Sequence, residues 1–343
     1  MEFGFMLRFR DPPRGENVPE MWLENIEMAQ FCESLGFDSC FTTEHHGIVD
    51  GYNPAPLITC MAIAAKTERI KVGTGVFLLP FYHPLQVAET AAMVDVLSNG
   101  RLILGLGLSN NEKEFVRHGL KIRNQVTLLE EGIEILKRAW TEDSVSFYGR
   151  NYSFKNQRVT PRPIQKPHPP IWLGAGTEFG IRRAARLGLP IFISSYTPLP
   201  VAHNWVKLYR DLCKKRGNKP EVTIWRDGYV APDSKTAERV RKSFWKFARE
   251  ERWFYFSSFP GRDAEWFGIA ERIKTEEDFS RSDVDPCLLV GTPDEVIEQI
   301  EILREELDCK HLVFRSRFGT GPSVEEARSS LKLFGEKVIP HFK

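Results

Sequence analysis

Three ionisable side chains, Glu44, His45 and His46, directly follow an apolar run that predicts a buried strand, Phe37 to Thr43. In an α/β barrel, functional groups project from the carboxyl ends of the strands, so acid–base chemistry is expected there. Successive strand side chains point to opposite faces, so we expect one histidine to enter the barrel mouth and the other to pack. A metal site is disfavoured, because the chain contains no HxH or HxxxH spacing.

Glycine clusters end three further strand-like runs, and only the segment Gly174 to Gly180 leads directly into a helix. A helix N-terminus offers free backbone N–H groups and a partial positive charge, both of which favour a phosphate. The candidate phosphate-binding residues here are Gly176, Thr177, Phe179 and Gly180. The spacing GxGxxxG differs from the dinucleotide fingerprint and indicates a monophosphate. The alternative is that Thr177 only caps the helix and the glycines allow close packing.

The elements that must position these groups alternate between short apolar runs and amphipathic stretches along most of the chain, which predicts parallel βα units. A single (β/α)8 TIM barrel over residues 1–343, with insertions, fits this alternation. An open doubly wound sheet would favour a glycine-rich fingerprint after its first strand, and Leu7 to Asp11 supplies none. The eight expected strands are Phe3–Leu7, Phe37–Thr43, Ile70–Leu79, Arg101–Leu108, Ile171–Ala175, Ile191–Ser195, Thr223–Val230 and Lys310–Arg315.

Two segments interrupt the alternation. Residues 143–170 are expected to form an inserted hairpin and a proline-rich connector. Residues 253–286 form a long segment rich in Phe, Gly, Asp and Ser, which we expect to be a mobile active-site loop. A helix is expected to begin after Thr292, because Thr292, Pro293 and Glu295 match a capping pattern.

Composition excludes several classes of protein. The 343 residues carry a formal net charge of +1, which suggests neither nucleic acid nor an anionic membrane as a partner. No apolar run is long enough to cross a membrane and no signal peptide is evident, so a cytoplasmic location is expected. The 6 cysteines lack CxxC spacing and are interpreted as reduced core thiols.

Many segments taken in order resemble one family, the flavin-dependent monooxygenases related to the α-subunit of bacterial luciferase. The resemblance runs through nearly the whole chain. Its segments are Leu35-Gly36-Phe37, Glu44-His45-His46, Val72-Gly73-Thr74, Leu79-Pro80, His83-Pro84, Asp95 with Leu97-Ser98-Asn99-Gly100-Arg101, Gly188-Leu189-Pro190, Gly291-Thr292-Pro293, Leu331-Lys332-Leu333-Phe334 and Val338-Ile339-Pro340.

The resemblance implies a barrel that binds reduced FMN, adds O2 to form a C4a-hydroperoxyflavin and oxygenates a small organic substrate. A separate NAD(P)H-dependent flavin reductase would supply the reduced FMN, and the protein would be a homodimer. A dehydrogenase that uses the deazaflavin F420 is an alternative on the same barrel, and so is a non-catalytic flavin-binding or partner subunit.

The resemblance also assigns site residues. It places the acid–base role at the flavin on His45, with Glu44 beside it. It implies a non-proline cis peptide at Gly75-Val76 beneath the flavin and an aromatic residue near the ring at Trp253.

This chain departs from the luciferase α-subunit after the fourth strand. Gly107 takes the position of its reactive cysteine and remains a candidate cofactor-binding residue, while Leu108 takes the position of its phosphate-binding arginine. Loss of this arginine should weaken FMN binding unless another cation compensates, and Arg123 is one candidate.

Overall fold

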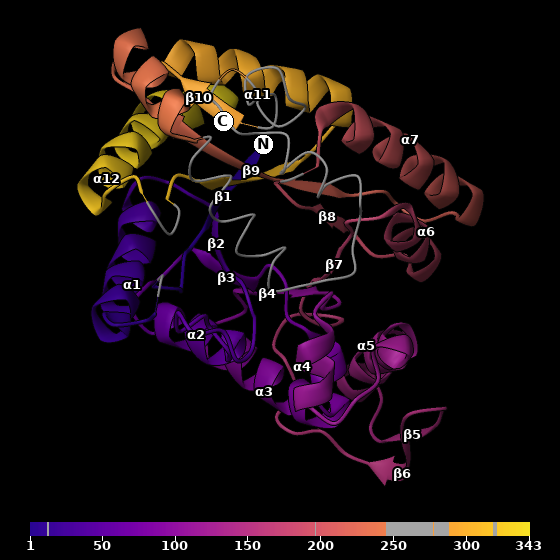
Figure 1. The fold of residues 1–343 in the computed structure, drawn as a ribbon. Coiled ribbons are helices and arrows are strands. Elements are labelled where there is room, and N and C mark those ends of the chain that lie inside the picture. Colours follow the sequence, from indigo (N-terminus) through magenta and orange to yellow (C-terminus); the bar gives the residue numbers. More distant parts are fainter. Residues whose placement is uncertain (12–13, 196, 245–276, 278–287, 318–320) are drawn as a thin grey trace.

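The computed structural model describes the whole chain except residues 12–13, 196, 245–276, 278–287 and 318–320. Eight parallel strands form a closed barrel, with neighbouring strands in the order β9, β11, β1, β2, β3, β4, β7 and β8. Pairing of β8 with β9 closes the ring, and helices surround it (Figure 1). The predicted (β/α)8 barrel is therefore confirmed.

Most barrel strands are shorter than the apolar runs that predicted them, but β1 is as long as its run and β9 begins one residue earlier. They are β1 (Glu2–Met6), β2 (Ser39–Thr42), β3 (Lys71–Thr74), β4 (Leu102–Leu106), β7 (Ile171–Gly174), β8 (Ile191–Ile193), β9 (Val222–Val230) and β11 (His311–Arg315).

A further parallel strand, β10 (Leu288–Gly291), pairs with the second half of β9. Asp227 of β9 is in register with Leu288 of β10 and also with Arg315 of β11, so these two strands lie on opposite edges of β9. The sequence interpretation did not include β10, because a run of only four residues is a weak strand signal.

Helix ends follow recognisable capping signals. Proline occupies the first turn of α1, α2, α3, α7 and α11, where its missing N–H has no intrahelical role. The helix predicted after Thr292 is confirmed, with a capping box between Thr292 and Glu295. Ser323 and Glu326 form a second capping box.

The α-helices whose full extent the structure describes are α1 (Val18–Ser34), α2 (Pro56–Ala64), α3 (Pro84–Leu97), α4 (Glu112–Arg117), α5 (Gln125–Thr141), α6 (Glu178–Leu187), α7 (Leu199–Arg216), α11 (Pro293–Leu307), α12 (Val324–Leu333) and α13 (Ile339–Phe342). Shorter helical segments are η1 (Leu79–Phe81), η2 (Ile122–Asn124) and the π-helical η4 (Phe334–Val338).

Residues 234–244 are also helical. The loop expected over residues 253–286, including Trp253, lies almost entirely outside the described residues.

Large side chains fill the barrel interior. Phe41, Trp172 and Phe192 contact one another, with ring centroids 5.4 to 6.0 Å apart. Met6, Ile103, Trp225 and Val313 complete this inner cluster, and a larger apolar layer lies between the strands and the helices. The barrel is therefore packed below its mouth, so a ligand can only enter from an end.

The segment from Asp95 to Arg101, which is part of the family resemblance, fastens α3 to its neighbours. The buried Asp95 carboxylate accepts hydrogen bonds from the amides of Ile164 and Gln165. The Arg101 guanidinium donates to the carbonyls of Ala64 and Ile70 at distances of 2.9 Å. These contacts are structural and lie outside the cavity described below.

Residues 145–157 form an antiparallel hairpin of β5 (Val145–Tyr148) and β6 (Ser153–Gln157), separate from the barrel sheet. Figure 1 shows this hairpin extending beyond α5. In the part of the chain that the structure describes, no helix is both long and apolar enough to span a membrane.

Candidate active site

A cavity of about 310 Å³ lies at the carboxyl ends of the barrel strands, a volume within the range of small-molecule sites. Loops after β2, β3, β4, β7 and β8 line it, together with side chains of β9 and β11. The predicted site residues that line it are Glu44, His45, Gly75, Val76, Gly107, Gly176, Thr177 and Gly180.

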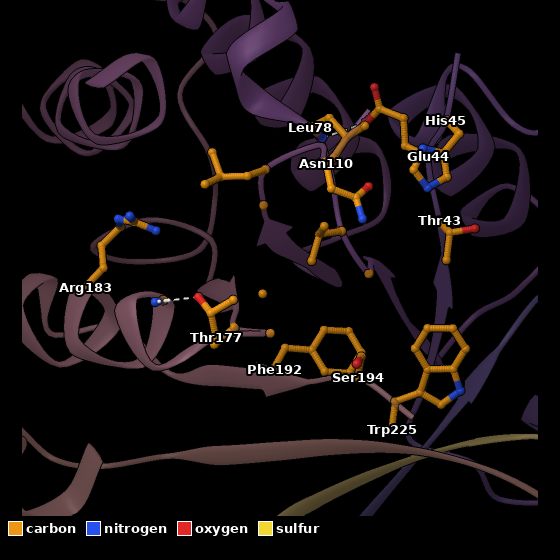
Figure 2. A pocket seen from close by; sticks show the side chains of 18 of the residues that line it. Thr43, Glu44, His45, Leu78, Asn110, Thr177, Arg183, Phe192, Ser194 and Trp225 are labelled. Carbon is orange, nitrogen blue, oxygen red and sulfur yellow. Dashed lines mark hydrogen bonds between the residues drawn. The ribbon is translucent and has the colours of Figure 1, made fainter. Parts of the chain in front are cut away.

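Figure 2 shows the polar groups at opposite sides of this cavity. Glu44 and His45 lie on one side, and Thr177 and Arg183 lie on the other. Phe192 and Trp225 lie between them, toward the barrel interior.

His45 is held by a carboxylate that the sequence interpretation missed. Its Nδ1 lies 3.1 Å from Oε1 of Glu114, in the first turn of α4. The ring also packs edge-on against Tyr52, with the centroids 5.0 Å apart. The side chain of His45 is 13% exposed, while that of Glu114 is 1% exposed. His45 therefore contacts both the cavity and a buried acceptor.

His46 points to a different carboxylate and does not line the cavity. Its Nε2 lies 2.7 Å from Oε1 of Glu44. The same carboxylate accepts hydrogen bonds from the Tyr82 hydroxyl at 2.7 Å and from the Leu78 amide at 2.8 Å. One histidine lines the cavity and the other does not, but strand alternation is not the reason. Strand β2 ends at Thr42, and the adjacent residues Glu44 and His45 both line the cavity.

The protonation of these groups follows from their surroundings. Burial alone would raise the pKa of the Glu114 carboxyl. The hydrogen bond and charge of His45, with hydrogen bonds from Ser109 and the His46 amide, outweigh burial and hold the pKa of Glu114 below its usual value. Burial, followed by the charge and hydrogen bond of Glu44, raises the pKa of Tyr82, so this hydroxyl stays protonated and donates.

The floor of the cavity is apolar and built around Val76. The peptide bond Gly75-Val76 is cis, which confirms the expectation from the family resemblance. A Cβ at Gly107 would lie 2.3 Å from Cγ2 of Val76, and one at Gly174 would lie 2.8 Å from Cγ1 of Val76. Glycine at both positions therefore makes the space in which the Val76 side chain packs.

The opposite end of the cavity can hold an anion. The Thr177 hydroxyl caps α6 by accepting a hydrogen bond from the Gly180 amide at 3.2 Å, so the capping role of Thr177 is confirmed. Thr177 also lines the cavity, and a Cβ at Gly176 would meet no atom within 4 Å. The hydroxyl and the open glycine backbone therefore remain accessible to a phosphate.

Arg183 brings a cation to this end from the second turn of α6. Its Nε donates to Oε1 of Glu130 at 3.0 Å, and its side chain lines the cavity. Arg123, the cation considered from the sequence, lies in η2 and does not line the cavity. Phe179 does not line it either, and this residue is 80% exposed.

Two buried ion pairs stand beside the remaining wall. Arg315 donates through Nε and Nη2 to Asp227 at 2.7 and 2.9 Å, and its guanidinium lies 4.6 Å from the Trp225 ring centroid. Arg10 donates to Asp50 at 2.8 Å and does not itself line the cavity, but its guanidinium lies 5.5 Å from the ring centroid of Tyr52, which does. Arg315 and Trp225 line the cavity, so this wall is polar but its charges are paired.

These residues fit a flavin mononucleotide. One end carries groups that can bind an anion, the floor around Val76 is apolar, and the His45 imidazole faces the same space. Among the described residues, no group of three or more His, Cys, Asp or Glu side chains is placed to hold a metal ion.

Residues 1–308 match the model of a family described as luciferase-like monooxygenase. The oxygenase component of the flavin-dependent trigonelline monooxygenase of Acinetobacter baylyi is 26% identical, over 100% of this chain and 96% of that protein. The alkanal monooxygenase alpha chain of Photobacterium leiognathi is also 26% identical, over 98% of this chain and 97% of that protein.

Solved structures give the same result. Monooxygenase RslO1 from Streptomyces bottropensis superposes with a TM-score of 0.86 and 28% identity, covering 100% of both chains.

A sequence relative named for a different cofactor is the F420-dependent glucose-6-phosphate dehydrogenase of Amycolatopsis mediterranei, which is 26% identical over 93% of this chain and 94% of that protein.

Proposed function

Because the chain belongs to the luciferase-like monooxygenase family, we propose that it is the oxygenase component of a two-component system. It would bind reduced FMN delivered by a separate NAD(P)H-dependent flavin reductase and use O2 to oxygenate a small organic substrate. The observation that carries this proposal is one cavity that combines a phosphate-binding helix start, the Gly75-Val76 floor and His45.

Each part of the cavity has a task in binding. The amides at the start of α6, the Thr177 hydroxyl and Arg183 would hold the phosphate. The apolar floor would support one face of the ring system, and Phe192 and Trp225 would exclude water from below. When bound, reduced FMN supplies the two electrons that activate O2.

His45 is the group placed to handle protons at the reacting end. An imidazole can donate and accept near neutral pH, and it acts on a ligand only if one ring nitrogen faces the ligand. The contact between Nδ1 and Glu114 assigns this task to Nε2. Glu44 would act through His46, Tyr82 and the Leu78 amide by keeping the loop after β2 in place.

An F420-dependent dehydrogenase is the second candidate, since relatives of similar identity carry that activity. Such an enzyme would transfer a hydride to or from the deazaflavin without consuming O2. The phosphate-binding end does not separate the two, because both cofactors carry a phosphate.

A homodimer forms part of the proposal. Two helices that contact each other each carry exposed apolar side chains, Ile58 on α2 and Met93 and Leu97 on α3. This face is the one through which we propose that two copies pair.

The test is an anaerobic titration followed by rapid mixing with O2. We expect reduced FMN to bind and its reoxidation to differ from that of free reduced FMN. His45→Ala should change the reoxidation rate by about tenfold or more, as loss of an acid–base group does. His341→Ala is the matched control, because His341 is exposed near the C-terminus and contacts Glu301.

Two results would contradict the proposal. Binding of F420 without binding of reduced FMN would identify a dehydrogenase. Reoxidation kinetics identical to those of free flavin would indicate a protein that does not use the cofactor for chemistry.

A further inference from the structure

Glu114 links the loop after β2 to the start of α4 across the cavity's edge. Its Oε1 accepts a hydrogen bond from the His46 amide at 2.6 Å and lies 3.1 Å from Nδ1 of His45. Its Oε2 accepts a hydrogen bond from the Ser109 hydroxyl. The carboxylate is buried, so these contacts determine its orientation.

We propose that Glu114 is a positioning residue that fixes the tautomer of His45, with the proton on Nδ1 and the lone pair on Nε2. The use of this lone pair in catalysis rests on the proposed function, whereas the tautomer itself does not.

The chemistry of the partners carries this proposal. An ionised carboxylate can only accept hydrogen bonds, so Nδ1 must bear a proton to bond to it. Hydrogen bonding to His45, Ser109 and the His46 amide holds the pKa of Glu114 low, in spite of its burial, so the ionised form prevails. A neutral imidazole with its proton on Nδ1 necessarily carries its lone pair on Nε2.

Glu114 from α4 is the carboxylate that contacts Nδ1 of His45. Other ionisable groups that face the ring from the described part of the chain include Tyr52, from the loop before α2, and the chain neighbour Glu44. The Glu44 carboxylate is instead hydrogen-bonded to His46, the Tyr82 hydroxyl and the Leu78 amide. The Tyr52 hydroxyl lies 2.6 Å from the Thr43 hydroxyl.

A purely structural role for Glu114 would predict something different. In that case the hydrogen bonds from Ser109 and the His46 amide would be the reason that Glu114 is buried there. The tautomer of His45 would then be determined by other neighbours. The tautomer is therefore the property to measure.

The experiment uses the flavin-free full chain labelled with 15N-histidine. Long-range 1H–15N spectra at a pH where histidine is neutral distinguish the two tautomers, and the signal of His45 is identified by its absence in His45→Gln. We expect wild type to show protonated Nδ1. Glu114→Gln should retain it, because the His46 amide keeps the carbonyl oxygen of the glutamine in the position of Oε1.

Glu114→Ala should lose the preference for protonated Nδ1. Glu112→Ala is the control, since Glu112 lies on the same helix and is exposed. A wild-type spectrum with protonated Nε2 would overturn the proposal without any variant, and so would an unchanged signal in Glu114→Ala. The wild-type measurement therefore decides even if that variant does not fold.

Flavin kinetics form the second arm. Glu114→Ala should slow the His45-dependent part of reoxidation by about tenfold to a hundredfold, and the double variant with His45→Ala should lose no more than His45→Ala alone. Additive losses would overturn the assignment of Glu114 to His45. If His45→Ala does not affect the flavin, the proposed function fails while the tautomer result stands.

Discussion

Arg183 is the cation that we propose for the flavin phosphate, because it lines the cavity and follows the cap residue Thr177 by six residues in α6. We predict that Arg183→Ala weakens FMN binding by about tenfold, the loss of one charge-assisted hydrogen bond. Riboflavin lacks the phosphate, so its affinity should change little. Equilibrium fluorescence titration with both flavins measures the two effects.

Arg182→Ala is the matched control for this prediction. Arg182 is the neighbouring arginine, but it pairs with Glu178 at the surface and does not line the cavity. Equal losses for FMN and riboflavin in Arg183→Ala would indicate a packing role and would remove Arg183 from the phosphate.

Part of the site could be predicted from the sequence for a geometric reason. His45, Gly75 and Thr177 each follow a strand end along the chain, and the carboxyl ends of barrel strands converge at one mouth. Glu114 and Arg183 reach the site from helices. Whether a helical residue faces the mouth depends on how the helix packs, which no local pattern encodes.

Glu114 nevertheless had a signal in the sequence. It follows the end of β4 by eight residues and stands in the first turn of a short helix, where an acidic side chain is common. Phe179 illustrates the opposite error, since its place in the motif suggested contact with a ligand and its side chain points to solvent.

Strand β11 places an unusual histidine at the opposite end of the barrel from the cavity. His311 is in register with Glu2 of β1, its Nε2 lies 2.8 Å from the Ser39 hydroxyl of β2, and its ring contacts Trp172 of β7. Burial lowers the pKa of His311 to about 4, with the charge of Glu2 opposing this effect.

This histidine should make the fold sensitive to acid. Below pH ~6.5 the unfolded chain binds a proton at His311, whereas the folded chain does not until pH is about 4. Stability is therefore lost as pH falls through this window, by about 3 kcal/mol at its end. Urea unfolding at a series of pH values should show a smaller loss for His311→Gln. Equal pH profiles for the two proteins would contradict the low pKa.

At the same scale, the strands could be located from the sequence but their ends could not. The apolar run Ile70–Leu79 predicted one long strand, whereas β3 ends at Thr74, before the cis bond, and η1 begins at Leu79. Apolar side chains that pack beneath the cavity look the same in the sequence as those of a strand.

For the whole molecule, the closed barrel could be predicted because eight alternating units leave few other topologies. Association between copies depends instead on which side chains are exposed at the surface. The exposed apolar residues Ile58 and Leu97 are 68% and 57% exposed on α2 and α3, which lie side by side in Figure 1. Exposed apolar groups on neighbouring helices are a feature of many interfaces.

We therefore predict that the chain forms a dimer with twice the monomer mass of 39.4 kDa. The double variant Ile58→Glu with Leu97→Glu would bury unpaired charge at the interface, and should weaken association by about a hundredfold. Ile302→Glu is the control, because Ile302 is exposed on α11, away from this face. Light scattering after size-exclusion chromatography at several concentrations measures the mass. A monomeric wild type would contradict the predicted dimer. A double variant that remains dimeric while Ile302→Glu dissociates would place the interface elsewhere.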